Sequence, residues 1–115
     1  NDLALLHYSG ALETLSKLDD PQSAVEIEIL LGQVLVDAGQ RDEAAEHYLS
    51  GLAVAEANDF RVLQGELLAR LGEVEPDWSQ RMNYLQRSLS LFRELGAVDR
   101  MREVQNLVHR AVMGK

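Results

Sequence analysis

The sequence contains no cysteine, so disulfide bonds, thiolate metal sites and cysteine nucleophiles are excluded. Aromatic residues make up only 5% of its 115 residues, and there are only two prolines. No apolar run approaches the roughly 18–20 residues that a membrane-spanning helix needs. The first residues do not resemble a secretory signal either. We therefore expect a cytoplasmic protein that does not bind a membrane.

Basic residues are scarce in the first half of the chain. Residues 1–60 hold 12 acidic and two basic side chains, whereas residues 61–115 hold seven acidic and nine basic ones. Phosphate groups would be repelled by the acidic half, and the basic excess of the second half is small. Nucleic acid is therefore not an expected partner.

The composition is rich in residues that favour helices. Alanine, leucine and glutamate are abundant, and they lose little side-chain freedom in a helix. The apolar residues recur at intervals of three and four, which is the spacing of one helical face. We expect an all-α protein with helices near residues 2–18, 21–38, 41–57, 59–74, 77–95 and 99–113.

Capping and turn residues separate these helices. Asp20 and Asp77 precede helices as N-caps, and Asp77 has Gln80 at the spacing of a capping box. Gly39 and Gly96 can take the left-handed conformation that ends a helix. Asn58-Asp59 is expected to end one helix and cap the next, and Asp99 to cap the last.

A repeated pattern is the strongest signal in the chain. Ala4-x3-Tyr8-x2-Ala11-Leu12 recurs forty residues later as Ala44-x3-Tyr48-x2-Gly51-Leu52, and thirty-seven residues after that, weakened, as Arg81-x3-Leu85-x2-Ser88-Leu89. Leu30-Leu31-Gly32 matches Leu67-Leu68-Ala69 at the same spacing of thirty-seven. Two different helices with one offset predict a solenoid whose unit is a pair of helices.

The residues Leu31-Gly32-x2-Leu35, followed by Ala44-x3-Tyr48, resemble the tetratricopeptide repeat. That family carries Leu-Gly-x2-Tyr followed by Ala-x3-aromatic. The resemblance implies an antiparallel helix-pair solenoid in which Gly32 and Ala44 let paired helices approach closely. It departs from the family at Glu28, Glu56, Pro76 and Arg81, where tryptophan, proline, glycine and alanine are usual.

In this register the chain forms a single repeat domain over residues 1–115. Residues 2–18 match the second helix of one repeat, residues 21–57 and 59–95 form two full repeats, and residues 99–113 form a C-terminal helix. We therefore expect a fragment of a longer array; the alternative is that residues 2–18 are a natural N-terminal capping helix. The segment from Tyr84 to Gly96 is similar to large bacterial signalling regulators, which also contain long units of this kind.

Catalysis and metal binding have little support in the sequence. His7, His47 and His109 are far apart, and although Glu43 and His47 stand four residues apart on one helix, a pair is not a metal site. No acid, base and nucleophile are placed together, and no glycine-rich phosphate loop follows a strand. We expect neither an enzyme nor a cofactor. Trp78 is expected to pack against the preceding helix.

The resemblance instead implies protein binding in a concave groove, lined by the first helix of each pair. Some members of that family bind the C-terminal carboxylate of a chaperone with a set of lysine and asparagine residues. That set is missing here, and Ile29 and Gln33 stand at two of its positions. We therefore expect a peptide or helix with apolar and basic groups. The alternative is an assembly module that associates with copies of itself. The groove positions carried over from the family are Glu26, Ile29, Gln33, Val36, Asp37, Leu63, Glu66, Arg70, Glu73 and Val74.

Overall fold

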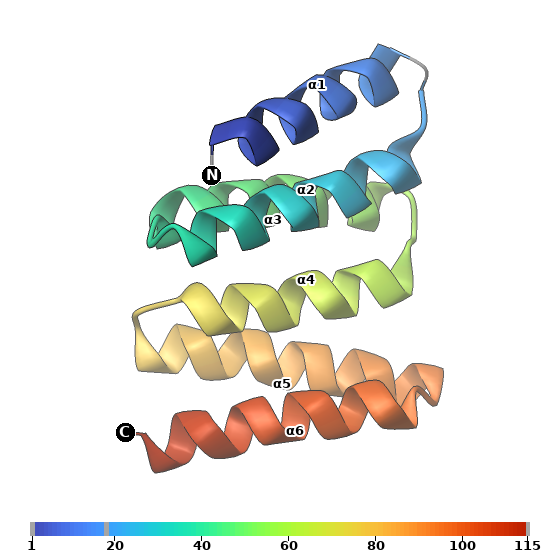
Figure 1. The fold of residues 1–115 in the computed structure, drawn as a ribbon. Coiled ribbons are helices and arrows are strands. Elements are labelled where there is room, and N and C mark those ends of the chain that lie inside the picture. The colour runs from blue at the N-terminus through green and yellow to red at the C-terminus, as the bar shows by residue number, and fades with distance from the viewer. Residues whose placement is uncertain (1, 18, 115) are drawn as a thin grey trace.

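The computed structural model describes residues 2–17 and 19–114, which form six helices and no strand (Figure 1). This confirms the all-α prediction. The helices follow one another as a stack measuring 41 × 30 × 21 Å, with α1 at one end and α6 at the other (Figure 1). Their bounds are α1 Asp2–Lys17, α2 Pro21–Asp37, α3 Arg41–Ala57, α4 Arg61–Val74, α5 Trp78–Leu95 and α6 Val98–Met113.

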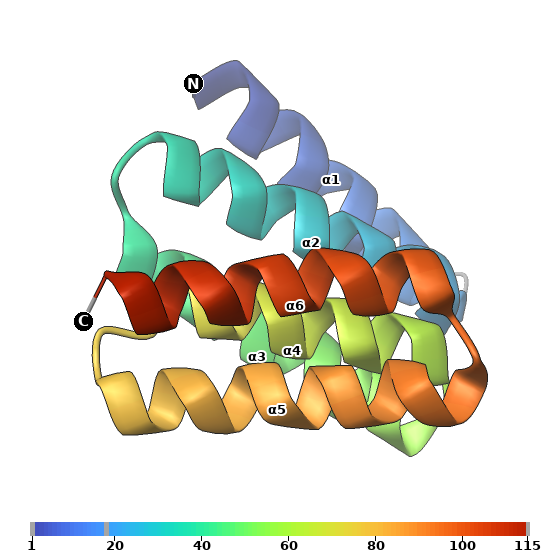
Figure 2. The same cartoon turned by 90° about the horizontal axis from the view of Figure 1, so that it is seen from below.

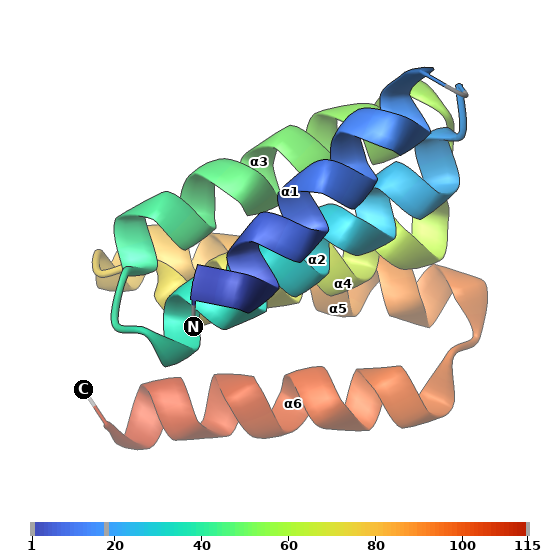
Figure 3. The ribbon, with the colours of Figure 1, turned by 45° about the horizontal axis from the view of Figure 1, so that its top comes forward.

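The helices pack in sequence, each against the next. The most extensive contacts join α2 to α3 and α4 to α5, which are the two predicted pairs. Helix α1 lies along α2 (Figure 3), and α6 lies beside α5 after a short turn (Figure 2). This arrangement is an all-α helix-pair solenoid, as the repeat predicts. Within the described residues, no helix has the length and apolarity needed to cross a membrane.

The even-numbered helices also touch one another directly. Helix α2 contacts α4, and α4 contacts α6, whereas no such contact joins the described parts of α1 and α3 or of α3 and α5. The stack is therefore tighter along α2, α4 and α6. A stack that is tighter on one side curves toward that side, so these three helices line its inner face.

The core consists of two clusters that meet at α4. The first joins α2 and α3 to buried residues of α4, including Leu67 and Leu71, and the second joins Ala69 of α4 to α5 and α6. Because α4 contributes to both clusters, neither pair has a complete core by itself. This is the nearest-neighbour packing expected of a solenoid.

Small residues bring the paired helices together, as expected for Gly32. The ring of Tyr48 lies so close to Gly32 that a methyl group there would overlap it, with the ring carbon Cζ at 2.6 Å. In the second pair, the ring of Phe92 lies on Gly65 in the same way, 2.5 Å from where a Cβ would stand. Tyr48 therefore packs closely on the first helix of its own pair, and it also belongs to the core cluster that includes α4.

Several predicted helix ends are confirmed. The carboxylates of Asp20 and Asp77 accept hydrogen bonds from the backbone N–H groups of Ser23 (3.1 Å) and Gln80 (3.0 Å). Gly39 and Gly96 have φ angles of +80° and +69°, in the left-handed region. At Gly39, the backbone N–H of the next residue, Gln40, donates to the carbonyl of Leu35 at 2.8 Å. This is a Schellman end, in which glycine avoids the steric penalty of a side chain.

Two predicted starts are wrong. Helix α4 begins at Arg61 and not at residue 59, because Asp59 adopts a φ of +57° and ends α3 with the same hydrogen-bond pattern as Gly39. Helix α6 begins at Val98, so Asp99 lies in its first turn and does not cap it; Ala97 holds the N-cap position. Helix α5 begins at Trp78, one residue after Asp77. The predicted end of the first helix, Leu18, lies outside the described residues.

Candidate functional site

The inner face brings all ten predicted groove positions onto two neighbouring helices, α2 and α4. Nine of them line one of three cavities between the even-numbered helices. Asp37 lines none of the three and accepts a hydrogen bond from the amide nitrogen of Gln33 at 3.1 Å. Ile29 and Val74 also belong to the first core cluster, so their side chains are largely buried although each lines a cavity.

The largest of these cavities is an apolar hollow of about 470 Å³ between the N-terminal halves of α2 and α4. Its apolar lining comes from Ile29 and Leu30 on α2 and from Val62 and Leu63 on α4. Leu30 and Val62 are 43% and 45% exposed, so two large apolar side chains face solvent in one place. The polar lining residues of this apolar hollow are Gln22, Glu26, Glu66 and Arg100.

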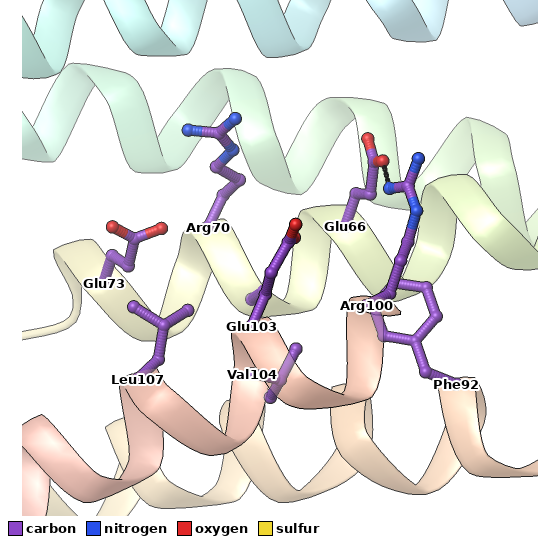
Figure 4. Close-up of a pocket in the computed structure, with 9 residues that line it drawn as sticks. Glu66, Arg70, Glu73, Phe92, Arg100, Glu103, Val104 and Leu107 are labelled. Atoms are coloured by element: carbon purple, nitrogen blue, oxygen red, sulfur yellow. Dashed lines mark ion pairs between the residues drawn. The ribbon is translucent and has the colours of Figure 1, made fainter. Parts of the chain in front are cut away.

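The second cavity, of about 220 Å³, lies between α4 and α6 and is shown in Figure 4. We call it the acidic cavity because three glutamates and two arginines are among its lining residues. Arg100 of α6 forms an ion pair with Glu66 of α4, drawn as a dashed line in Figure 4. The guanidinium of Arg100 also lies 6.0 Å from the centre of the Phe92 ring. The lining residues are Glu66, Ala69, Arg70, Glu73, Phe92, Arg100, Glu103, Val104 and Leu107.

The two arginines of the acidic cavity are both engaged within the protein. Arg70 donates a hydrogen bond to the amide oxygen of Gln33, which ties α4 to α2, and Arg100 ties α6 to α4. The carboxylates of Glu73 and Glu103 have no hydrogen-bond or ion-pair partner in the part of the chain that the structure describes. The charge left uncompensated around the acidic cavity is therefore negative.

The third cavity is small, about 80 Å³, and lies between α2 and α4 beside Tyr48. Val36 lines it together with Gln33, Arg70 and Glu73. Burial raises the pKa of the Tyr48 phenol above its ordinary value, while the positive charge of Arg70 opposes the shift. The phenol is therefore held in its neutral form at the edge of the inner face.

Residues on α6 complete the inner face, and the prediction omitted them. The sequence could have indicated them, because the groove positions on α2 and on α4 are thirty-seven residues apart. The same offset applied to Leu63, Glu66 and Arg70 gives Arg100, Glu103 and Leu107. Those three residues all line the acidic cavity. Leu30 and Val62 stand directly beside the predicted positions Ile29 and Leu63.

A polar cluster between α2 and α3 was also missed. The Nδ1 of His47 lies 2.7 Å from the carboxylate of Glu28, a buried residue of α2. The hydroxyl of Ser50 donates to the other oxygen of Glu28 at 3.5 Å. The carboxylate is shared between two donors and faces no cavity of the inner face, so the cluster satisfies a buried charge.

The indole of Trp78 contacts the last helix. Its indole N–H donates to the carbonyl of Ala111 at 3.4 Å, which links the start of α5 to the end of α6. Packing against the preceding helix was expected.

Among residues 2–17 and 19–114, no three histidine, aspartate or glutamate side chains come together in a way that could hold a metal ion.

The comparisons with known proteins leave the chain without an assigned family. No protein-family model matches it, and no curated protein matches it either.

Proposed function

We propose that this chain is a protein-interaction module that binds a segment of a partner along its inner face. What supports the proposal is the apolar hollow, where Leu30 and Val62 are held together and open to solvent. Contiguous apolar surface of this kind is unfavourable in water unless a partner covers it. A hollow of about 470 Å³ is within the usual size range of a binding pocket, and it takes an apolar anchor.

The charge of the inner face indicates which polar groups the partner carries. The carboxylates of Glu73 and Glu103, which have no partner within the described residues, line the neighbouring acidic cavity, and Glu26 lines the hollow. An anionic surface attracts cations and repels acidic segments. The proposed ligand is therefore a peptide or helix that combines apolar and basic side chains, and its binding weakens as salt screens the charges. The tetratricopeptide-like repeat pattern supports the same use of the face, by analogy with that family.

A matched pair of leucine substitutions tests the proposal. Leu30 lies in the hollow, whereas Leu49 is on α3, lines none of the cavities, and is similarly exposed, 47% against 43%. Peptides selected on an array of basic and apolar sequences are titrated by fluorescence polarisation. Leu30→Gln should weaken their binding about tenfold, which corresponds to one lost apolar anchor, and Leu49→Gln should leave it unchanged. Equal affinities for both variants would contradict the proposal.

The second candidate function is self-association through the two ends of the stack. Large apolar side chains are exposed there: Leu3 of α1 is 82% exposed and Met113 of α6 is 72% exposed. The first half of the chain is acidic and the second half slightly basic, so head-to-tail contact would bring opposite charges together. Light scattering behind size-exclusion chromatography, over a concentration series at low and high salt, tests it. A dimer or ladder that dissociates in salt supports assembly, and a monomer of 12.8 kDa throughout contradicts it.

A further inference from the structure

Arg100 occupies a special place on the inner face. It lines both the apolar hollow and the acidic cavity, and so does its ion-pair partner Glu66. The two cavities are therefore adjacent, and they share this ion pair, which Figure 4 shows on the side of the acidic cavity. A segment that fills the hollow and extends toward α6 has to pass over it.

The ion pair is open to solvent and easily exchanged. The side chains of Arg100 and Glu66 are 42% and 29% exposed. Exposed ion pairs contribute little to stability because water already solvates both charges, so breaking one costs little when another cation replaces the first. Arg100 also has a second favourable contact that does not involve Glu66, because its guanidinium lies over the face of the Phe92 ring.

We infer that Arg100 is an internal competitor for the ligand, occupying in the free protein the carboxylate that an arginine or lysine of the bound segment takes over. This inference rests on the proposed function and names the recognition element within it. An apolar residue of the ligand fills the hollow, and the neighbouring cationic residue displaces Arg100 from Glu66. Glu103, which lines the same cavity and has no partner within the described residues, adds negative charge that helps to retain that cation. The carboxylates select a ligand with a cationic residue. Because that residue has to displace Arg100, ligands with little positive charge bind less tightly.

The charge count around the acidic cavity gives the direction of the effect. Three glutamates and two arginines line it, for a net charge of −1. Removing the charge of Arg100 makes that −2 and leaves Glu66 free. Arg102 offers the matched control, because it is on the same helix, carries the same charge, and among the described residues forms its ion pair with Asp99 of that helix, at 3.6 Å. Substituting either arginine with glutamine changes the net charge of the protein equally.

The test uses fluorescein-labelled peptides of about 12 residues, with leucines three and four residues apart and a single arginine beside them. A second series carries citrulline, the neutral analogue, in place of that arginine. Each is titrated by fluorescence polarisation against the unaltered protein, Arg100→Gln and Arg102→Gln, with circular dichroism to check the fold. Arg100→Gln should bind the arginine peptides about two- to fivefold more tightly, because the competing pair is gone. Arg102→Gln and the citrulline peptides should show no such gain.

Each outcome separates the inference from the proposed function. If both glutamine variants gain equally, overall charge is responsible and Arg100 is not a competitor. If Arg100→Gln weakens binding, Arg100 contacts the ligand itself, and the inference is overturned while the groove remains. If arginine and citrulline peptides bind the unaltered protein equally well, the cationic subsite is wrong. If no peptide binds any of the three proteins, the proposed function fails as well.

Discussion

The contact between Gly32 and the ring of Tyr48 makes the stability of the first pair sensitive to a single methyl group. The added carbon of Gly32→Ala would overlap the ring, and Tyr48 is only 1% exposed, so it cannot swing into solvent. Overpacking a closed site typically costs about 1–3 kcal/mol, whereas alanine is favoured over glycine in a helix by about 1 kcal/mol. We therefore expect Gly32→Ala to lower the free energy of unfolding by up to about 2 kcal/mol.

Gly10 provides the control for this substitution. It also lies within a helix, α1, but nothing lies within 4 Å of where its Cβ would stand. Gly10→Ala should therefore raise the free energy of unfolding by up to about 1 kcal/mol, through helix propensity alone. Urea unfolding followed by circular dichroism measures both changes. If Gly32→Ala is stabilising by the same amount as Gly10→Ala, the ring does not rest on the glycine and the packing described here is wrong.

A second substitution tests the cause of the loss. At the offset of thirty-seven, the second repeat has Ala69 and Leu85 where the first has Gly32 and Tyr48. The combination of alanine with leucine is thus one that the fold already accommodates. The double variant Gly32→Ala/Tyr48→Leu should be less destabilised than the sum of the two single changes. Simple additivity would mean that the two side chains do not compete for the same space.

Two further predictions concern single residues. Asp59→Gly should raise the free energy of unfolding by about 0.5–1 kcal/mol, because Asp59 holds a φ of +57° that glycine adopts without strain; a loss of stability in urea would contradict the capping role given to this position. Burial raises the pKa of Tyr48 above 10.0, so the folded state favours the neutral phenol. Its contribution to stability is complete below about pH 10 and is lost as the pH rises through the folded pKa, so unfolding curves at alkaline pH should show a decline that Tyr48→Phe reduces.

Helix order and pairing could be predicted from the sequence because they depend on local signals. Glycines and aspartates at the ends of apolar periodic segments have few alternatives to capping or terminating a helix, as Gly39 and Asp77 illustrate. The wrong start at Asp59 has a physical reason. Aspartate tolerates the left-handed conformation as well as the N-cap position, so the residue type alone does not distinguish the end of one helix from the start of the next.

Side-chain pairing could not be predicted from the repeat, because the repeat conserves positions and not sizes. At the offset of thirty-seven, Glu28 and Ala55 of the first pair correspond to Gly65 and Phe92 of the second. The larger residue is on the first helix in one pair and on the second helix in the other. In the first pair, Glu28 has His47 as its partner across the pair, at 2.7 Å. The spacing of Glu43 and His47 on one helix gave no indication of this partner on another helix.

The charge that the inner face presents to a partner also depends on which of its charged residues are already paired. The predicted set contains four acidic residues and one arginine, Arg70, and α6 adds Arg100. From the sequence alone, these arginines would offset much of the negative charge. In the folded protein each is engaged by a neighbouring helix, Arg70 by Gln33 and Arg100 by Glu66. The arginines therefore join the helices to one another, and the carboxylates that remain available to a partner, such as Glu73 and Glu103, favour a cationic segment.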